Sequence, residues 1–174
     1  KRLRAAGIRA GFFVQFGYPG ETRADVDMTL ALLRRCRPDD IGMSVSYPPP
    51  GTRFHERVRD ELGAQQNWRD SDDLAMLYRG PFATGFYRQL HAVLHREQRI
   101  RRAIDEVGAA LANPSRLRPR HARATARAAL DWLGLPVARR RLARLERSPH
   151  AGLPPLSPGM SYEEAARSTP QEDA

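Results

Sequence analysis

The sequence predicts an α/β fold in which a strand–helix–strand unit is followed by a helical region. Short apolar runs at residues 8–16 and 41–47 are typical of buried strands, and the residues between them have helical spacing. A long stripe of apolar residues with the same spacing begins near residue 84. Because a crossover helix joins parallel strands, we expect the two strands to be parallel neighbours.

The first element is predicted to be the end of a helix followed by a strand. Residues 1–7 are rich in cations and end at Gly7, as in the last turn of a helix. A chain that opens within a helix is expected to have lost its beginning. Residues 8–16 (IRAGFFVQF) are too few for a buried helix and rich in strand-forming residues, so we interpret them as a core strand.

A tight turn and a helix are predicted next. Residues 17–21 (GYPGE) contain two glycines and a proline, and Thr22 with Asp25 forms a capping-box-like start. The helix is expected to run to about Arg37. Its apolar face contains Val26, Leu30, Leu33 and Cys36, so we expect Cys36 to be a small core residue.

The second strand, residues 41–47, alternates in polarity. Ile41, Met43, Val45 and Tyr47 share one predicted face, and small residues occupy the other. The following PPPG at residues 48–51 ends the strand, and Thr52 is expected to cap a short helix that runs to Leu62.

The remaining chain is predicted to be mostly helical. Residues 63–81 are expected to be irregular, and a long helix is predicted from Thr84 to Leu111. Two further helices, at 119–133 and 137–146, are predicted on either side of Pro136, which favours a break. The composition beyond Ser148 predicts a disordered tail.

The positive charge is confined to one segment. The net charge is +9, and residues 96–147 contain fourteen arginines but only five acids. Such a cluster favours a polyanionic partner, either nucleic acid or an anionic membrane. However, Lys1 is the only lysine, and this preference for arginine is typical of a GC-rich genome. We therefore consider nucleic-acid binding the less favoured interpretation.

Several classes of protein are excluded by simple counts. A single cysteine, Cys36, excludes an internal disulfide and supplies too few thiolates for an iron–sulfur cluster. No apolar run approaches the length of a membrane span, and no leader peptide is evident. We expect a cytoplasmic protein on these grounds.

Two strings of residues resemble a known enzyme family. Residues 11–22 (GFFVQFGYPGET) are similar to the fifth strand and turn of radical S-adenosylmethionine enzymes, in which GFPGET recurs. Residues 39–52 (DDIGMSVSYPPPGT) resemble the sixth strand and its exit loop. Residues 78–95, including His91 and His95, resemble the C-terminal extension of the members that carry an upstream cobalamin-binding domain.

The resemblance implies an architecture. Residues 1–62 would contain the fifth and sixth strands of a partial parallel (β/α) TIM-like barrel, residues 63–147 a helical extension, and residues 148–174 the disordered tail. The complete enzyme would cleave S-adenosylmethionine reductively at a [4Fe–4S] cluster. The radical formed would drive methylation, cyclisation or rearrangement of an unknown small-molecule substrate, with cobalamin held by the upstream domain.

The same resemblance implies a set of cofactor-binding residues. In the family, the ends of these two strands contact the adenine of S-adenosylmethionine. For Gln15, a core glutamine with satisfied hydrogen bonds is an equally good interpretation, and Glu21 is expected to hold the turn rather than touch ligand. The candidates are Val14, Gln15, Phe16, Gly17, Pro19, Ser46 and Tyr47.

The chain also lacks two features of the family. The three-cysteine loop and the glycine-rich amino-group site have no counterpart, so the cluster ligands must come from a missing N-terminal half. The fragment alone is therefore expected to be inactive, and no catalytic or metal-ligating residue is predicted. His91 and His95 have a spacing that suits a metal ion, but no third ligand accompanies them, and we interpret them as surface or core histidines.

Two alternatives remain. The chain could be a basic helical module that binds nucleic acid or an acidic partner through residues 96–147. It could also be a structural fragment without a role of its own, which an exposed sheet edge would make unstable or prone to aggregation.

Overall fold

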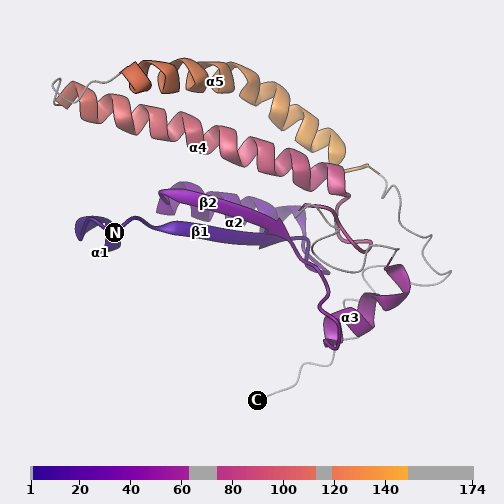
Figure 1. The fold of residues 1–174 in the computed structure, drawn as a ribbon. Helices are drawn as coiled ribbons and strands as arrows, with labels where there is room; N and C mark the ends of the chain where they lie inside the picture. The colour runs from indigo at the N-terminus through magenta and orange to yellow at the C-terminus, as the bar shows by residue number, and fades with distance from the viewer. Residues whose placement is uncertain (1, 63–73, 113–118, 149–174) are drawn as a thin grey trace. The chain divides into compact units, whose positions relative to one another are not determined.

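The computed structural model describes residues 2–62, 74–112 and 119–148 of the chain (Figure 1). The described residues form two compact units. Unit 1 contains the described residues up to Tyr87, and unit 2 spans Arg88–Arg147. The boundary falls inside the long helix α4 (Thr84–Ala112).

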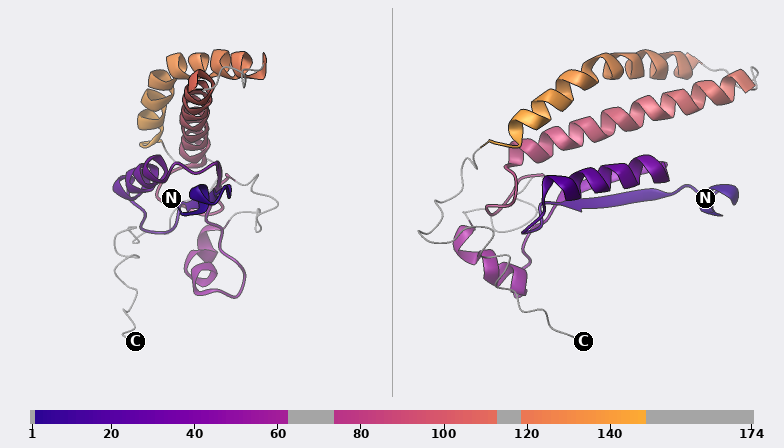
Figure 2. Two further views of the ribbon diagram at one scale, coloured as in Figure 1. Left: turned by 90° about the vertical axis from the view of Figure 1, so that its left-hand side faces the viewer. Right: turned by 180° about the vertical axis from the view of Figure 1, so that it is seen from behind.

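Unit 1 is built on two parallel strands. Strand β1 (Gly11–Phe16) pairs with β2 (Asp40–Val45), and the register runs from Gly11 opposite Asp40 to Phe16 opposite Val45. Helix α2 (Arg23–Cys36) connects them, and it lies alongside the sheet in both sets of views (Figures 1 and 2). The predicted strand–helix–strand unit with parallel strands is confirmed.

The N-terminus of α2 is capped by the two residues predicted from the sequence, and its C-terminus ends near the predicted position. The Thr22 hydroxyl accepts a hydrogen bond from the Asp25 N–H, and the Asp25 carboxylate accepts one from the Thr22 N–H at 2.7 Å, which completes a capping box. At the other end, Arg37 adopts a left-handed conformation with φ of 50° and donates its N–H to the Leu33 carbonyl.

The core of unit 1 combines α2 with one face of the sheet. Val26, Leu30 and Leu33 of α2 are buried, and so are the alternating residues of β2. Cys36 is exposed, so the prediction that it is a core residue was wrong. It occupies the last position of α2, next to Arg37, whose left-handed conformation ends the helix. The buried residues of β2 are Ile41, Met43 and Val45.

The two shorter helices of unit 1 also have a boundary near a residue that the sequence predicts. Helix α1 (Arg2–Ala5) ends before Gly7, whose φ is 72°. Helix α3 (Arg53–Val58) starts after Thr52, whose hydroxyl accepts from the His55 N–H at 3.1 Å. A 3₁₀ turn at Arg59–Glu61 follows. Residues 63–73 lie outside the described residues, as does the predicted tail beyond Ser148.

Unit 2 is an antiparallel pair of helices. Most of α4 packs against α5 (Pro119–Leu145), as Figures 1 and 2 show. Gln89 donates to the Ala138 carbonyl at 3.0 Å, and the Arg99 guanidinium binds the Asp131 carboxylate at 2.6 Å. The apolar contact on α5 is formed by Ala128, Leu135, Ala138 and Leu142, which are all buried.

The break predicted at Pro136 does not occur, and α5 is one continuous, curved helix (Figure 1). Proline removes one helical hydrogen bond and bends the axis, but contacts with α4 hold the chain on both sides of it. Arg96 donates to the Gly134 carbonyl at 3.3 Å before the proline, and Gln89 binds Ala138 after it.

The prediction of a partial TIM-like barrel with a helical extension was wrong as a description of this fold. The described chain is mostly helical, with 63% helix, and its strands form one two-stranded parallel sheet. A strand–helix–strand unit is common to many parallel folds, so its presence does not establish a barrel. Most of the helix comes from α4 and α5, whose pattern carries no information about a sheet.

Candidate binding site at the strand ends

The carboxyl ends of β1 and β2 lie side by side in unit 1. Phe16 is opposite Val45, and the Ser46 N–H donates to the Phe16 carbonyl at 2.7 Å. The glycine-rich turn after β1 and the proline-rich loop after β2 therefore begin at the same edge of the sheet. In parallel α/β proteins, this edge is where ligands bind.

The turn after β1 is held by Glu21. Gly17 has a φ of 81°, and its N–H donates to the Glu21 carboxylate at 2.9 Å. The same carboxylate oxygen accepts from the Tyr87 hydroxyl at 3.2 Å. Burial raises the pKa of Glu21, while its two hydrogen bonds act in the opposite direction. Glu21 thus has the structural role that the sequence predicts.

Aromatic side chains surround the turn. The Tyr78 hydroxyl donates to the Gly17 carbonyl, and burial and the Glu21 charge raise the pKa of Tyr87. A Cβ atom on Gly17 would lie 3.0 Å from the Met76 sulfur, so only glycine fits without displacement. Phe54 packs edge-on against Tyr78, with ring centroids 5.3 Å apart.

A buried hydroxyl lies at the end of β2. Ser46 is 5% exposed, and no partner for its hydroxyl is found among the described residues. Because a buried hydroxyl without a hydrogen bond is costly, Ser46 is suited to bind a polar group of a ligand.

One face of the sheet is open. Phe13 is 74% exposed, and its ring packs over Gly42, where a Cβ atom would lie 2.6 Å from the Phe13 ring. Gln15 is also exposed and pairs with Ser44 in the register. This face therefore presents an aromatic ring and two polar side chains to its surroundings.

The predicted site residues differ in the exposure and direction of their side chains. Val14 and Gln15 point to opposite faces, because side chains alternate along a strand, so their side chains cannot contact a ligand from the same side. Gln15 is exposed and Val14, Pro19 and Tyr47 are half-buried, whereas Phe16, Gly17 and Ser46 are buried. The polar backbone groups of Gly17 are already bound by Glu21 and Tyr78.

The sequence analysis did not predict the residues that support the turn. Three buried residues contact Gly17 or Glu21, and each lies 55 or more positions further along the chain. They are Met76, Tyr78 and Tyr87, which are 0–4% exposed. A usable signal was present: residues 78–87 contain four aromatic residues around Gly80. Such a cluster indicates packing, but the sequence does not show against which turn.

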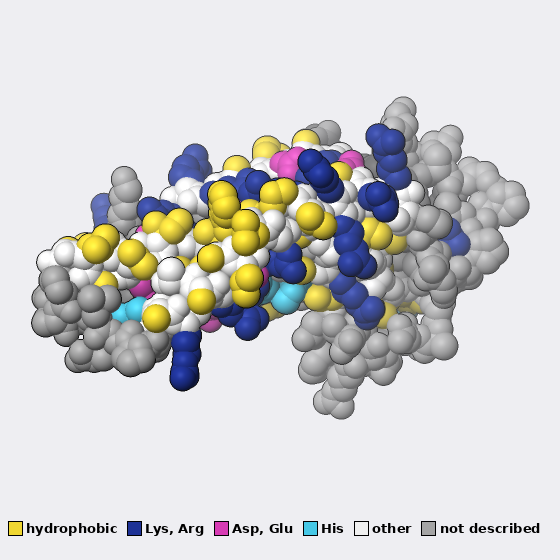
Figure 3. Space-filling model, turned by 90° about the horizontal axis from the view of Figure 1, so that it is seen from above, with side chains coloured by type: hydrophobic (Ala, Val, Ile, Leu, Met, Phe, Trp, Pro, Cys, Tyr) yellow, Lys and Arg dark blue, Asp and Glu magenta, His cyan; other side chains and the backbone are white. Residues whose placement is uncertain are grey.

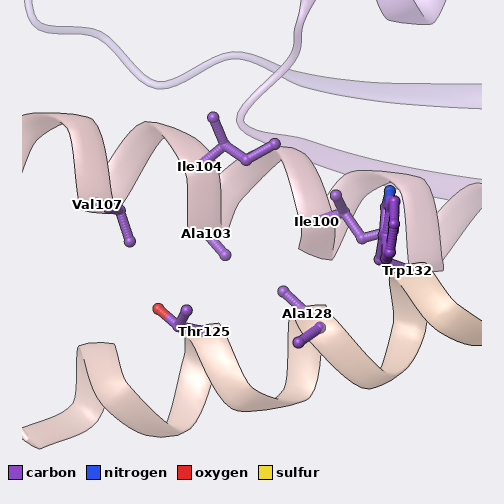
Figure 4. Close-up of a pocket in the computed structure, with 8 residues that line it drawn as sticks. Ile100, Ala103, Ile104, Val107, Thr125, Ala128 and Trp132 are labelled. Atoms are coloured by element: carbon purple, nitrogen blue, oxygen red, sulfur yellow. The ribbon is translucent and has the colours of Figure 1, made fainter.

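Unit 2 has an apolar groove of its own. The groove lies between α4 and α5 and has a volume of about 420 Å³ (Figure 4). Thr125 supplies the only hydroxyl among its lining residues, and none of them is titratable. The groove therefore offers no catalytic group. It is lined by Ile100, Ala103, Ile104, Val107, Thr125, Ala128, Ala129 and Trp132.

The two histidines of α4 stack on one another. The ring centroids of His91 and His95 are 4.2 Å apart, and burial lowers the pKa of His91. Over residues 2–62, 74–112 and 119–148, no group of three or more His, Cys, Asp or Glu side chains suited to a metal ion is found.

Within the part of the chain that the structure describes, no helix has both the length and the apolar character needed to cross a bilayer. The sequence matches no protein-family model, and no match is found among curated proteins or solved structures.

Proposed function

We propose that this chain is the C-terminal part of a radical S-adenosylmethionine enzyme and that the ends of β1 and β2 contribute to binding the adenine of S-adenosylmethionine. The observation that carries the proposal is the parallel pairing of the two resembling strings. The turn of the first string and the exit loop of the second begin at one edge of the sheet.

The chemistry of this edge suits an adenine ring. An adenine has apolar faces and a polar rim, so it needs apolar contacts and a few hydrogen-bonding groups. The half-buried Pro19 and Tyr47 offer apolar surface, and the Ser46 hydroxyl offers a hydrogen bond. Because Gly17 has already used its backbone groups, its contribution is limited to close approach of the Cα atom.

The chain cannot supply the ligands of an iron–sulfur cluster. A cluster needs three or four thiolates, and Cys36 is the only cysteine and lies on α2. Cluster and cobalamin are therefore proposed to be held by other parts of the complete enzyme. When bound, S-adenosylmethionine would supply the 5′-deoxyadenosyl radical, and the residues described above would hold its adenine.

The test begins with the gene. We would sequence the DNA upstream of Lys1 for a segment encoding Cys-x3-Cys-x2-Cys and purify the complete product anaerobically. The product is expected to show cluster absorbance and to form 5′-deoxyadenosine. In it, Ser46→Ala is expected to raise the half-saturating S-adenosylmethionine concentration about five- to tenfold through loss of one hydrogen bond.

The matched control is Thr29→Ala, which also removes one hydroxyl but lies on α2. It is expected to behave as wild type. A complete protein that holds a cluster yet forms no 5′-deoxyadenosine would contradict the proposed reaction. Equal half-saturation in Ser46→Ala and wild type would contradict the proposed site.

A further inference from the structure

The outward face of α5 carries an apolar strip. The face of α5 that contacts α4 contains Ala128, Leu135 and Leu142. On the opposite side, Leu130, Leu133 and Val137 are 64–71% exposed. Their spacing of three and four residues puts them on one line along the helix. We call these three residues the outer strip.

Arginines flank the outer strip at both ends. Arg123 and Arg127 precede Leu130 by seven and three residues, and three more arginines follow Val137 by three, four and seven residues. All five are exposed. Figure 3 shows this face, with yellow apolar side chains in its middle and dark-blue basic side chains around them. The three that follow Val137 are Arg140, Arg141 and Arg144.

Only one acid of α5 lies near this charge, and it interacts with Arg127 alone among the five arginines. Asp131 is the only acid of the helix, and its side chain is 12% exposed and bound to Arg99 and Arg96 of α4. Arg139 points to another side of α5, where it binds Glu97 at 2.8 Å. The outward face therefore combines aliphatic side chains with five positive charges.

We propose that the outward face of α5 binds the surface of an anionic phospholipid membrane. Such a surface offers phosphate groups to the arginines and an apolar layer just beneath them to Leu130, Leu133 and Val137. Arginine suits this position, because its long stem allows the guanidinium to reach the headgroups while the helix lies deeper. The binding is peripheral and leaves α5 parallel to the membrane.

The other possible occupants fit less well. Duplex nucleic acid would engage the arginines but would have no use for three exposed aliphatic side chains. A second copy of the strip would bring ten arginines together, and like charges repel. The groove of Figure 4 is separate, since none of the three residues of the outer strip lines it.

The test is flotation of the 174-residue chain with lipid vesicles. Vesicles of phosphatidylcholine mixed with phosphatidylglycerol are expected to carry the protein, and pure phosphatidylcholine vesicles are not. Added salt should weaken the binding, because it screens the headgroup charge. Replacing Leu130, Leu133 and Val137 together by Gln should weaken it about tenfold or more.

The contribution of the arginines to membrane binding is tested in the same assay. Arg140→Gln, Arg141→Gln and Arg144→Gln together should also weaken binding about tenfold or more. All the replaced side chains are exposed, and circular dichroism would verify that each variant keeps its helix content.

Two matched controls are available. Three exposed aliphatic side chains can be replaced elsewhere, at Leu3, Leu32 and Leu111, and three exposed arginines at Arg9, Arg35 and Arg59. Both controls are expected to bind as wild type.

Three results would overturn the proposal. The first is absence of flotation with the anionic vesicles. The second is binding that survives loss of the outer strip, which would indicate charge alone. The third is binding of duplex DNA that competes with the vesicles and does not change when the outer strip is replaced, which would assign the face to nucleic acid.

Discussion

The protonation of Glu21 makes the stability of the turn after β1 depend on pH. Burial raises its pKa above the usual value of 4.5, although Gly17 and Tyr87 both donate hydrogen bonds to it. The folded protein therefore holds this proton to a higher pH than the unfolded chain does. Its contribution to stability is favourable below pH 4.5 and is lost as the pH rises through the raised pKa.

Glu21→Gln should remove this dependence on pH. The free energy of unfolding of the variant minus that of wild type is expected to increase from pH 4 to pH 7, because the variant has no proton to lose. Urea titrations at several pH values would measure it. Glu56→Gln, on an exposed position of α3, is the control, and a difference that is constant with pH would contradict the prediction.

Single residues were predictable where their partners are close in sequence. The capping box of Thr22 and Asp25, and the cap at Thr52, follow from patterns only four residues long. The hydrogen bond from Tyr78 to Gly17 joins residues 61 positions apart, and no local pattern indicates it. Of the candidate site, the strand ends were predictable, and the aromatic residues that hold them were not.

Among the elements, α5 shows how contacts between helices override a local signal. Pro136 predicted two separate helices, but α5 is continuous. Side chains of α4 bind the chain on both sides of the proline, at Asp131 and Gly134 before it and at Ala138 after it. The long helix Thr84–Ala112 was predicted to within one residue, because its apolar stripe is strong and uninterrupted. Contacts with another helix are not visible in a local pattern.

Asp131→Asn should weaken the pairing of the two helices. The variant keeps one acceptor oxygen for Arg99 but loses the charge that binds Arg99 and Arg96, whose hydrogen bonds and charges hold the pKa of Asp131 below its usual range. We expect a loss of about 1 kcal/mol in the free energy of unfolding.

Thermal or urea unfolding followed by circular dichroism would measure the loss. Glu106→Gln is the control, since this residue is exposed on α4. If both variants were equally stable, the ion pair between the helices would contribute nothing measurable.

At the scale of the whole molecule, the sheet of unit 1 has an open face. In the described residues, β1 and β2 pair only with one another, and Phe13 stands exposed on the open face. Unpaired strand edges and exposed aromatic rings favour association between chains. The first strand was predicted as a core strand over residues 8–16, but β1 spans Gly11–Phe16 and only Phe16 of it is buried. The second was predicted over residues 41–47, and β2 spans Asp40–Val45. The extent of the sheet was not predicted, because the number of strands depends on residues far apart in the chain.

Phe13→Thr should therefore reduce self-association. Removing the ring takes away most of the apolar surface on the open face, and we expect the association constant to fall about tenfold. Sedimentation velocity over a range of protein concentrations would measure it. Met28→Thr, which replaces an exposed apolar residue of α2, is the control, and equal concentration dependence in the two variants would show that the open face does not mediate association.

Cys36 has a practical consequence. It is the only thiol of the chain, and it is exposed at the end of α2. A maleimide dye or a nitroxide spin label would therefore attach at one defined place without any change to the sequence. A second cysteine introduced on α5 would then allow the distance between unit 1 and unit 2 to be measured by electron spin resonance, with the native thiol as the fixed reference.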